Sequence, residues 1–307
     1  MLDFDLYENL IRNVLTNEMR FNFQEFSFLL AEDNLHNRVQ RERIAQIFYE
    51  TFDVKNLFFS KNAVLSCFAT GRSTALVLDS GATLSEATTV HDGYALGKSN
   101  KRCNFGGEAL TNELGRYIEE ELNVQLGLRN GRASYAAYHR QQLLRTIKEA
   151  VYKTEENSQP NELGQPQTTV DFELPDRQTI KIDKSRLPDP FFSSYGQDIA
   201  YRGLHHLLND NINLCDIDIK KELYNNVIVT GGNSLLGGFV PRLQQKLAEV
   251  VTPQKCKLIS FPFPIERRFS AWIGGSILAS LSSFQGFWVG KQEWTEFGPS
   301  ILEKKCA

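Results

Sequence analysis

The chain has 307 residues, a formal net charge of −3 at pH 7, 41% hydrophobic residues and 23% charged residues. These values are typical of a globular protein with one large or two medium domains. They exclude the strongly basic surface that drives general nucleic-acid binding. The five cysteines are Cys67, Cys103, Cys215, Cys256 and Cys306. They include no CxxC pair, which argues against a zinc site or a disulfide framework and favours a reducing compartment.

The first part of the chain alternates helices and strands, which is typical of an α/β fold. It begins with an acidic amphipathic segment that is not a signal peptide, and no apolar run approaches the length of a membrane span. Apolar spacing predicts a helix over 7–19, a strand over 26–32, a helix over 38–52, a strand over 56–60 and a buried helix over 62–70.

Short apolar runs separated by DSG and HDG then predict an antiparallel meander over 73–99, with a hairpin turn at His91-Asp92-Gly93. Helices are expected over 107–122 and 138–153, followed by an exposed polar loop over 154–168. The remaining expected elements are a hairpin over 170–182, a helix over 198–213, a strand over 225–232, a helix over 239–250, a strand over 257–261 and an apolar helix over 270–281.

Two strands in this pattern deliver small residues to a turn, in VLDSGAT (77–83) and in VIVTGGNSLLGGF (227–239). Glycines there allow a ligand to approach the backbone and leave amides that can bind phosphate. Each motif alone is more typical of an ordinary turn. The helix segment RTIKEA (145–150) and the helix start IERRFSAW (265–272) are further candidates, although each can equally be a solvated charged surface. The pair His205-His206 has no acidic partner and is interpreted as a helix surface.

Five longer segments together resemble actin and the actin-related proteins, in the same order along nearly the whole chain. They are LLAEDNLHNRVQRERIAQIFYETF, AVLSCFATGRSTALVLDSG, HDGYAL, CDIDIKKELYNNVIVTGGN and RRFSAWIGGSILASLSSFQGFWVGKQEW. Within this family, DSGAT, TVHDGY, CDIDI and ERRFSAWIGGSILASL are most similar to the nuclear actin-related proteins of the fourth class. Those proteins are actin-like subunits of chromatin-remodelling and histone-acetyltransferase complexes.

The resemblance implies the α/β actin/Hsp70/sugar-kinase ATPase fold, with two lobes around a nucleotide cleft. It implies a first lobe from 1–69 and 270–307, a sheet subdomain of the second lobe from 70–105 and 200–269, and a peripheral helical subdomain from 106–199. It also implies that the first lobe is incomplete at its N-terminus, because the first phosphate hairpin of the family has no counterpart in this sequence. An exposed sheet edge and low stability of the isolated chain are then expected.

The resemblance further implies ATP or ADP with Mg as the cofactor. Asp79 matches the aspartate that holds the metal through water, and Ser80 and Gly81 match a phosphate loop. The adenosine side is implied to consist of Gly107, the helix residues Lys148 and Glu149, the glycine-loop residues Gly231, Gly232 and Asn233, Leu235 near the base, and Arg268 beside the adenine.

Several departures from actin point to weakened or lost nucleotide chemistry. Ala82 replaces a second aspartate, Thr83 replaces a glycine, and Asn62 replaces the glutamine that positions the attacking water. The hydrophobic plug of the actin filament has no clear counterpart around 185–200. We therefore expect a non-catalytic nuclear scaffold that binds actin or another actin-like protein and an amphipathic helix of a remodeller subunit, meets chromatin indirectly and has no membrane contact.

Two other readings remain. A conventional, cytoplasmic, filament-forming ATPase is the main alternative, although it would need the first phosphate loop and a water-positioning side chain. A sugar-kinase-like phosphotransferase would need a general-base carboxylate facing an acceptor pocket, and no insertion of that kind is visible.

Overall fold

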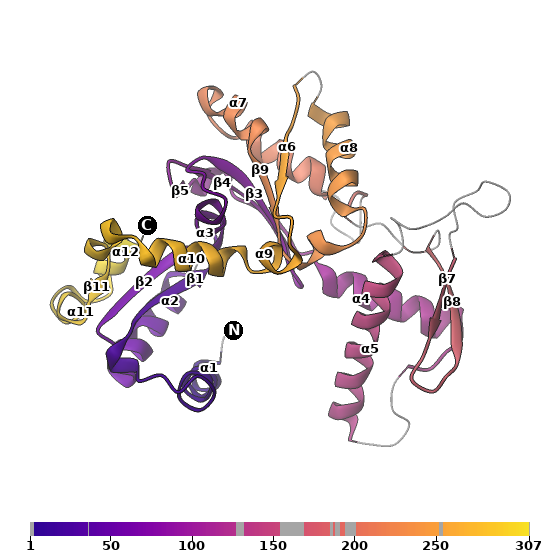
Figure 1. The fold of residues 1–307 in the computed structure, drawn as a ribbon, viewed down its shortest axis with the longest axis horizontal. Coiled ribbons are helices and arrows are strands. Elements are labelled where there is room, and N and C mark those ends of the chain that lie inside the picture. Colours follow the sequence, from indigo (N-terminus) through magenta and orange to yellow (C-terminus); the bar gives the residue numbers. More distant parts are fainter. Residues whose placement is uncertain are drawn as a thin grey trace. The chain divides into compact units, whose positions relative to one another are not determined.

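The protein is described by a computed structural model over residues 3–35, 37–126, 132–153, 169–184, 187, 191–193, 201–251 and 254–306. The chain forms two compact units (Figure 1). One apolar core cluster lies in unit 1 and two lie in unit 2. Unit 1 comprises Met1–Ala75, Thr88–Asn100 and Phe269–Ala307, and unit 2 comprises Leu76–Ala87 and Lys101–Arg268. Among the helices described, none has the length and apolarity needed to cross a bilayer.

Unit 1 is built on a small mixed sheet in the order β1-β2-β11. Strand β1 (Ser27–Glu32) runs parallel to β2 (Asn56–Lys61), and β11 (Val289–Gly290) runs antiparallel to β2. The helices of this unit are α1 (Phe4–Arg12), α2 (Arg38–Gln46), α3 (Asn62–Ala69), α10 (Ser270–Ser280), α11 (Lys291–Phe297) and α12 (Ser300–Lys305). Helices α1 and α2 continue into π-helical segments, Asn13–Glu18 and Ile47–Thr51.

Helices α3 and α10 pack unusually closely in unit 1. A Cβ atom at Gly274 would lie 1.7 Å from the carbonyl oxygen of Leu65, so only glycine fits at this crossing. The buried hydroxyls of Ser66 and Ser270 are hydrogen-bonded across the two helices at 3.0 Å. The small residues predicted in the 270–281 helix therefore serve the contact with α3.

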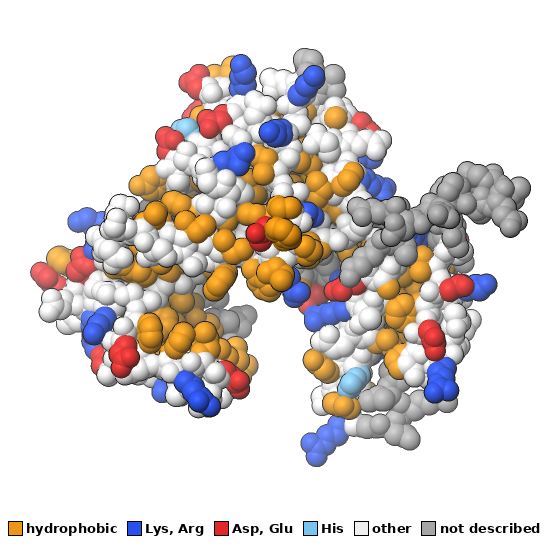
Figure 2. Space-filling model, viewed as in Figure 1, with side chains coloured by type: hydrophobic (Ala, Val, Ile, Leu, Met, Phe, Trp, Pro, Cys, Tyr) orange, Lys and Arg blue, Asp and Glu red, His pale blue; other side chains and the backbone are white. Residues whose placement is uncertain are grey.

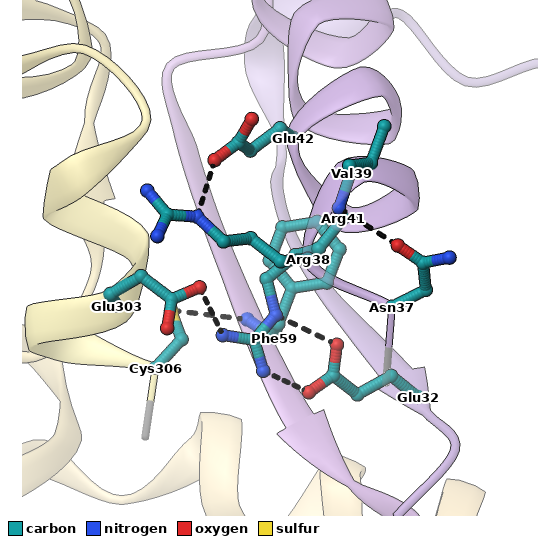
Figure 3. Close-up of polar contacts among 9 residues, drawn as sticks. All are labelled: Glu32, Asn37, Arg38, Val39, Arg41, Glu42, Phe59, Glu303 and Cys306. Carbon is teal, nitrogen blue, oxygen red and sulfur yellow. Dashed lines mark hydrogen bonds and ion pairs between the residues drawn. The ribbon is translucent and has the colours of Figure 1, made fainter. Parts of the chain in front are cut away.

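A buried arginine joins three further elements of unit 1 (Figure 3). Arg41 of α2 has only 2% of its side chain exposed, and its guanidinium makes a bidentate ion pair with Glu32 at the end of β1. It also lies 3.7 Å from the carboxylate of Glu303 on α12 and 5.8 Å from the ring centroid of Phe59. The neighbouring Cys306 accepts a hydrogen bond from the Phe59 amide at 3.5 Å.

Unit 2 contains a larger sheet in which β10 (Leu258–Ser260), β9 (Val227–Thr230) and β3 (Ala75–Ser80) are parallel neighbours. Strand β4 (Ser85–His91) follows β3 in the sheet order, and its first residues pair with β6 (Lys101–Cys103). The end of β4 pairs with β5 (Tyr94–Ala95) and belongs to unit 1.

The helices of unit 2 are α4 (Gly107–Arg116), α5 (Ala133–Lys153), α6 (Leu204–Asn213), α7 (Ile217–Asn225), α8 (Phe239–Val251) and α9 (Pro264–Arg268). Helix α4 continues into a π-helical segment, Tyr117–Glu121. A separate hairpin consists of β7 (Thr169–Glu173) and β8 (Thr179–Asp183), where the sequence predicted it. The predicted loop over 154–168 lies outside the described residues, as does most of 185–200.

Two expectations are corrected by the structure, and several short helices are added to those expected. Strand β3 does not belong to a purely antiparallel meander. It lies parallel to β9, a strand about 150 residues later in the sequence. His205 is not a surface residue: it is 6% exposed at the start of α6, and burial lowers its pKa to about 4. Helices α7, α11 and α12 were not predicted, because short charged helices give a weak periodic signal, and most of α9 lies in the segment 265–272 that was interpreted as a charged helix start.

None of the five cysteines, all of which lie in the described ranges, forms a disulfide. Cys256 is partly exposed, and the other four are buried. Burial raises the pKa of Cys67 to about 12 and that of Cys256 and Cys306 to about 11.

Candidate functional site

The first predicted motif forms the turn between β3 and β4 in unit 2. Strand β3 ends at Ser80, and the amide of Gly81 donates to the carbonyl oxygen of Leu84 at 2.9 Å, which closes the turn. The Ser80 side chain is completely buried, whereas Asp79 is partly exposed and Ala82 and Thr83 are exposed. Asp79 therefore carries the one carboxylate that this turn offers to a ligand.

The second predicted motif lies beside the first because β9 is the parallel neighbour of β3. Asp79 is aligned with Thr230, the last residue of β9, so both turns leave the same edge of the sheet. Ligands of open α/β sheets bind at this carboxyl edge. Gly231 has φ +92°, and a Cβ there would lie 2.3 Å from the Ser80 carbonyl oxygen and 2.5 Å from Asp79 Oδ1. Glycine is thus required where the two turns meet.

The start of α4 is the third part of the site. The amides of Gly107 and Glu108 donate to the carbonyl oxygens of Gly81 and Ala82 at 3.0 and 2.7 Å. A Cβ at Gly106 would lie 2.4 Å from the Ala82 carbonyl oxygen, so the glycine pair allows the helix start to meet the turn. Gly107, predicted to lie near adenosine, is buried at this junction.

Lys148 connects α5 to the same junction. Its ammonium donates to the Gly107 carbonyl oxygen at 2.9 Å and to Thr111 Oγ1 at 3.0 Å. Burial lowers the pKa of Lys148, and the nearby Glu149 carboxylate opposes this shift. Glu149 is exposed. The two helix residues therefore differ: Lys148 is tied to the α4 start, whereas Glu149 is open to solvent.

The turn after β9 is held by Arg267, which was not predicted as a site residue. Arg267 donates from its guanidinium to the carbonyl oxygens of Phe261 and Ser234, and its own carbonyl oxygen accepts from the Gly231 amide at 3.2 Å. Arg268, the residue predicted to flank adenine, is exposed at the end of α9, and Leu235 is partly buried in the 3-10 turn Gly232–Leu235. Because the two arginines are adjacent and of the same type, sequence pattern alone cannot separate these two roles.

Some backbone amides of the site remain available to donate hydrogen bonds to a ligand. The amides of Gly81, Gly107 and Gly231 already donate within the protein, whereas those of Ala82, Thr83 and Gly232 donate to no acceptor in the part of the chain that the structure describes. The last three residues are exposed. Amides of this kind at the end of parallel strands suit the phosphates of a nucleotide.

The acidic residues of the site also fit a magnesium nucleotide. Within the described ranges, no group of three His, Cys, Asp or Glu side chains could by itself enclose a metal ion. Magnesium bound with nucleotides needs only one or two carboxylates, since phosphates and water complete its shell. Asp79 would supply that carboxylate, and the exposed amides beside it would meet the phosphates.

A large cavity lies elsewhere, in unit 1. Its volume is about 880 Å³, and none of the predicted nucleotide residues line it. It is lined mainly by residues 53–55, the start of β2 and α11, and the ion pair between Asp53 and Lys291 lies in its wall. Size alone therefore does not identify the candidate site.

Comparison with known proteins agrees with this geometry. The sequence model described as Actin matches residues 1–307. The chain belongs to the actin family. Among curated members of that family, it is 34% identical to Actin-related protein 4 from Oryza sativa subsp. indica and subsp. japonica, over 99% of this chain and 76% of each relative. It is also 34% identical to Actin-related protein 4 from Arabidopsis thaliana, over 99% of this chain and 77% of the relative.

Membership of the actin family confirms the predicted α/β actin fold and the predicted resemblance to actin-related proteins. The actin fold usually binds a nucleotide with a divalent metal, and the two turns of unit 2 contain groups that suit both. Ser85, Thr111 and Arg267 of this actin-family chain were missed by the sequence analysis. Their residue types are common in any helix or strand, and only the contacts reveal their part in the site.

Proposed function

We propose that this actin-family chain is a non-catalytic scaffold subunit of a nuclear chromatin-remodelling or histone-acetyltransferase complex, with a cleft that binds ATP or ADP with Mg. The observation that carries the proposal is 34% identity to Actin-related protein 4 along 99% of the chain. The resemblance of DSGAT, TVHDGY and CDIDI to the nuclear fourth class supports the same assignment.

The nucleotide part of the proposal rests on unit 2. Asp79 would hold Mg through water, and the turn formed by Ser80 and Gly81 would receive the phosphates. The predicted adenosine side comprises Gly107, Lys148, Glu149, Gly231, Gly232, Asn233, Leu235 and Arg268, all of which belong to unit 2. Bound nucleotide would stabilise the folded state through linkage.

The non-catalytic part rests on two side chains. Asn62, at the start of α3, stands where actin has a longer glutamine that positions the attacking water. A displacement of one methylene is enough to misplace a reacting water. Ala82 provides no carboxylate where actin has a second aspartate. Both substitutions favour a chain that holds a nucleotide over one that hydrolyses it.

The partner surface that we propose is the outer face of α10 in unit 1. The sequence SAWIGGSILAS contains no charged residue, and a helix that is apolar all round is normally buried. Yet Trp272 is 73% exposed, and Ile277 and Leu281 are about 40% exposed. Figure 2 shows apolar side chains gathered over α10 and also over α1. An amphipathic helix of a partner subunit would cover such a face.

The nucleotide assignment is tested by the nucleotide content of the purified chain. We expect bound ADP or ATP in the wild-type protein, its loss in Asp79→Ala, and its retention in Asp218→Ala, which removes an exposed carboxylate from α7. Equal nucleotide content in the wild type and Asp79→Ala would contradict a role for this carboxylate. Absence of nucleotide from every variant would contradict the nucleotide part of the proposal and leave the scaffold part standing.

The scaffold assignment is tested by identifying the proteins that bind the tagged chain in cells. We expect subunits of nuclear chromatin complexes, loss of them in Ile277→Asp, and no loss in Ile217→Asp, which changes an exposed isoleucine of unit 2. Recovery with cytoplasmic filaments, together with single-turnover ATP hydrolysis well above background, would instead support the filament-forming ATPase.

A further inference from the structure

Asn233 lies at the point where the turn after β3, the turn after β9 and the start of α4 meet. It is 5% exposed. Its amide nitrogen Nδ2 donates to Ser80 Oγ at 3.0 Å and to the Gly81 carbonyl oxygen at 2.6 Å. Its Oδ1 faces α4, because a Cβ at Gly107 would lie 2.5 Å from that oxygen. One carboxamide thus contacts all three segments.

The direction of the hydrogen bonds can be assigned along a chain of buried hydroxyls. Ser85 Oγ donates its proton to the Phe105 carbonyl oxygen at 2.9 Å. Ser80 and Ser85 are 2.8 Å apart, so Ser80 donates to Ser85 and its own oxygen accepts from Asn233. Only a donor at position 233 completes this chain.

The Gly81 carbonyl oxygen is fully occupied by the same arrangement. It accepts from the Gly107 amide at 3.0 Å and from Asn233 Nδ2, and a carbonyl oxygen has two lone pairs. The plane of the peptide between Gly81 and Ala82 is therefore held from two sides. The amide on the other end of that peptide is the exposed amide of Ala82.

We infer that Asn233 is a positioning residue that aims the phosphate-binding amides of the 79–84 turn, rather than a residue that contacts the nucleotide itself. This inference rests on the proposed nucleotide site. It assigns Asn233 to the phosphate half of that site, although its position in the glycine loop predicted contact with adenosine. Loss of the two hydrogen bonds from Asn233 should therefore weaken phosphate binding and leave binding of the nucleoside unchanged.

The test compares Asn233→Asp with Asn211→Asp in the full chain. An aspartate at 233 keeps the shape of the side chain but has no hydrogen to donate, and it faces the Gly81 oxygen with another acceptor. Asn211 is a matched control, because it is also buried and its Nδ2 donates to the Ala87 carbonyl oxygen at 2.6 Å, away from the turns. Asn233→Ala removes the donor without adding charge and replaces Asn233→Asp should that variant fail to fold.

The first measurement is amide hydrogen exchange of the nucleotide-free protein. We expect exchange in 80–85 and 106–109 to be about tenfold faster in Asn233→Asp or Asn233→Ala than in Asn211→Asp, since a lost buried hydrogen bond has about that effect on local opening. Equal exchange of these segments in the 233 and 211 variants would overturn the inference, whether or not the wild type binds nucleotide.

The second measurement is the affinity for Mg-ADP and for adenosine, by calorimetric titration. We expect Mg-ADP to bind about tenfold more weakly to Asn233→Ala than to the wild type, with adenosine affinity changed less than about twofold. Equal losses for both ligands would show that Asn233 contacts the nucleoside and would overturn the inference. Failure of the wild type to bind Mg-ADP would contradict the proposed nucleotide site. The exchange measurement would then still test whether Asn233 holds the 79–84 turn in place.

Discussion

At the scale of single residues, Arg41 shows how a charge can be kept inside unit 1. Its side chain is 2% exposed, and its guanidinium is satisfied by Glu32 from β1 and approached by Glu303 from α12 (Figure 3). A bidentate pair of this kind fixes the relative orientation of the elements that carry it. Its removal leaves the Glu32 carboxylate, 13% exposed, without its main partner.

We predict that Arg41→Met lowers the free energy of unfolding by about 3 kcal/mol, because it removes the bidentate partner of a largely buried carboxylate. Arg38→Met is the matched control: Arg38 pairs with Glu42 on the same helix, but its side chain is 64% exposed, so no measurable change is expected. Urea unfolding of both variants checks this. Equal stability of the two would contradict the role of burial.

The buried His205 is expected to make the stability of the protein depend on pH. Its Nδ1 is buried and has no hydrogen-bond partner among the residues that the structure describes, and its pKa is lowered to about 4, mainly by burial and also by His206. The unfolded chain, with a histidine pKa near 6.5, therefore binds the proton more readily than the folded chain. The stability contribution is fully present above about pH 6.5 and is lost as the pH falls toward 4.

We expect the wild type to lose up to about 3 kcal/mol of stability through this residue between pH 7 and pH 4. His205→Phe should remove most of that dependence, while His206→Phe, at the neighbouring and more exposed position, should preserve it. Urea unfolding at a series of pH values measures the difference. A His205→Phe profile as steep as that of the wild type would contradict the prediction.

At the scale of elements, the α3–α10 crossing is set by one glycine. We predict that Gly274→Ala destabilises unit 1 by about 3 kcal/mol or more, because the added Cβ would overlap the Leu65 carbonyl oxygen, a backbone atom that cannot rotate away. Gly275→Ala is the control on the same helix. Its Cβ would lie 3.3 Å from a flexible Leu29 methyl group, and alanine favours helix, so a change within about 1 kcal/mol is expected.

Thermal and urea unfolding of the two alanine variants compare their stabilities directly. Similar losses in both would mean that α3 can move away from α10 at little cost. A stable Gly274→Ala protein would also remove the steric reason for a small residue at this position.

Elements with strong periodicity could be predicted from the sequence, and elements defined by partners could not. The apolar spacing of 38–52 and the apolar run of 270–281 predicted helices close to those observed. The parallel pairing of β3 with β9 was not predictable from local pattern, because a strand's partner is chosen by the tertiary fold. At the site, the glycines were identified by turn chemistry, whereas Arg267 was missed because its role depends on the carbonyl oxygens that surround it.

At the scale of the whole molecule, the separate cores of the two units predict separate unfolding. All three tryptophans, Trp272, Trp288 and Trp294, belong to unit 1, while the predicted nucleotide residues belong to unit 2. Tryptophan fluorescence should therefore follow unit 1 alone, and far-UV circular dichroism should follow both units. Non-coincident transitions are the expected sign of two independent units.

We predict that Mg-ADP at about 100 times its Kd stabilises unit 2 by about 2.7 kcal/mol. The circular dichroism transition should move to higher urea concentration, while the fluorescence transition stays in place. Coincident transitions that move together would mean that the two units unfold as one. A shift seen only in fluorescence would locate the ligand in unit 1.

The distribution of buried thiols has a practical consequence for following the molecule in time. A thiol-reactive dye added to the native chain meets one partly exposed sulfur, Cys256, next to β10. Cys67 and Cys306 become available only when unit 1 opens, and Cys103 and Cys215 only when unit 2 opens. The number and position of labels taken up per minute would thus record, for each unit separately and without any mutation, how often its core opens.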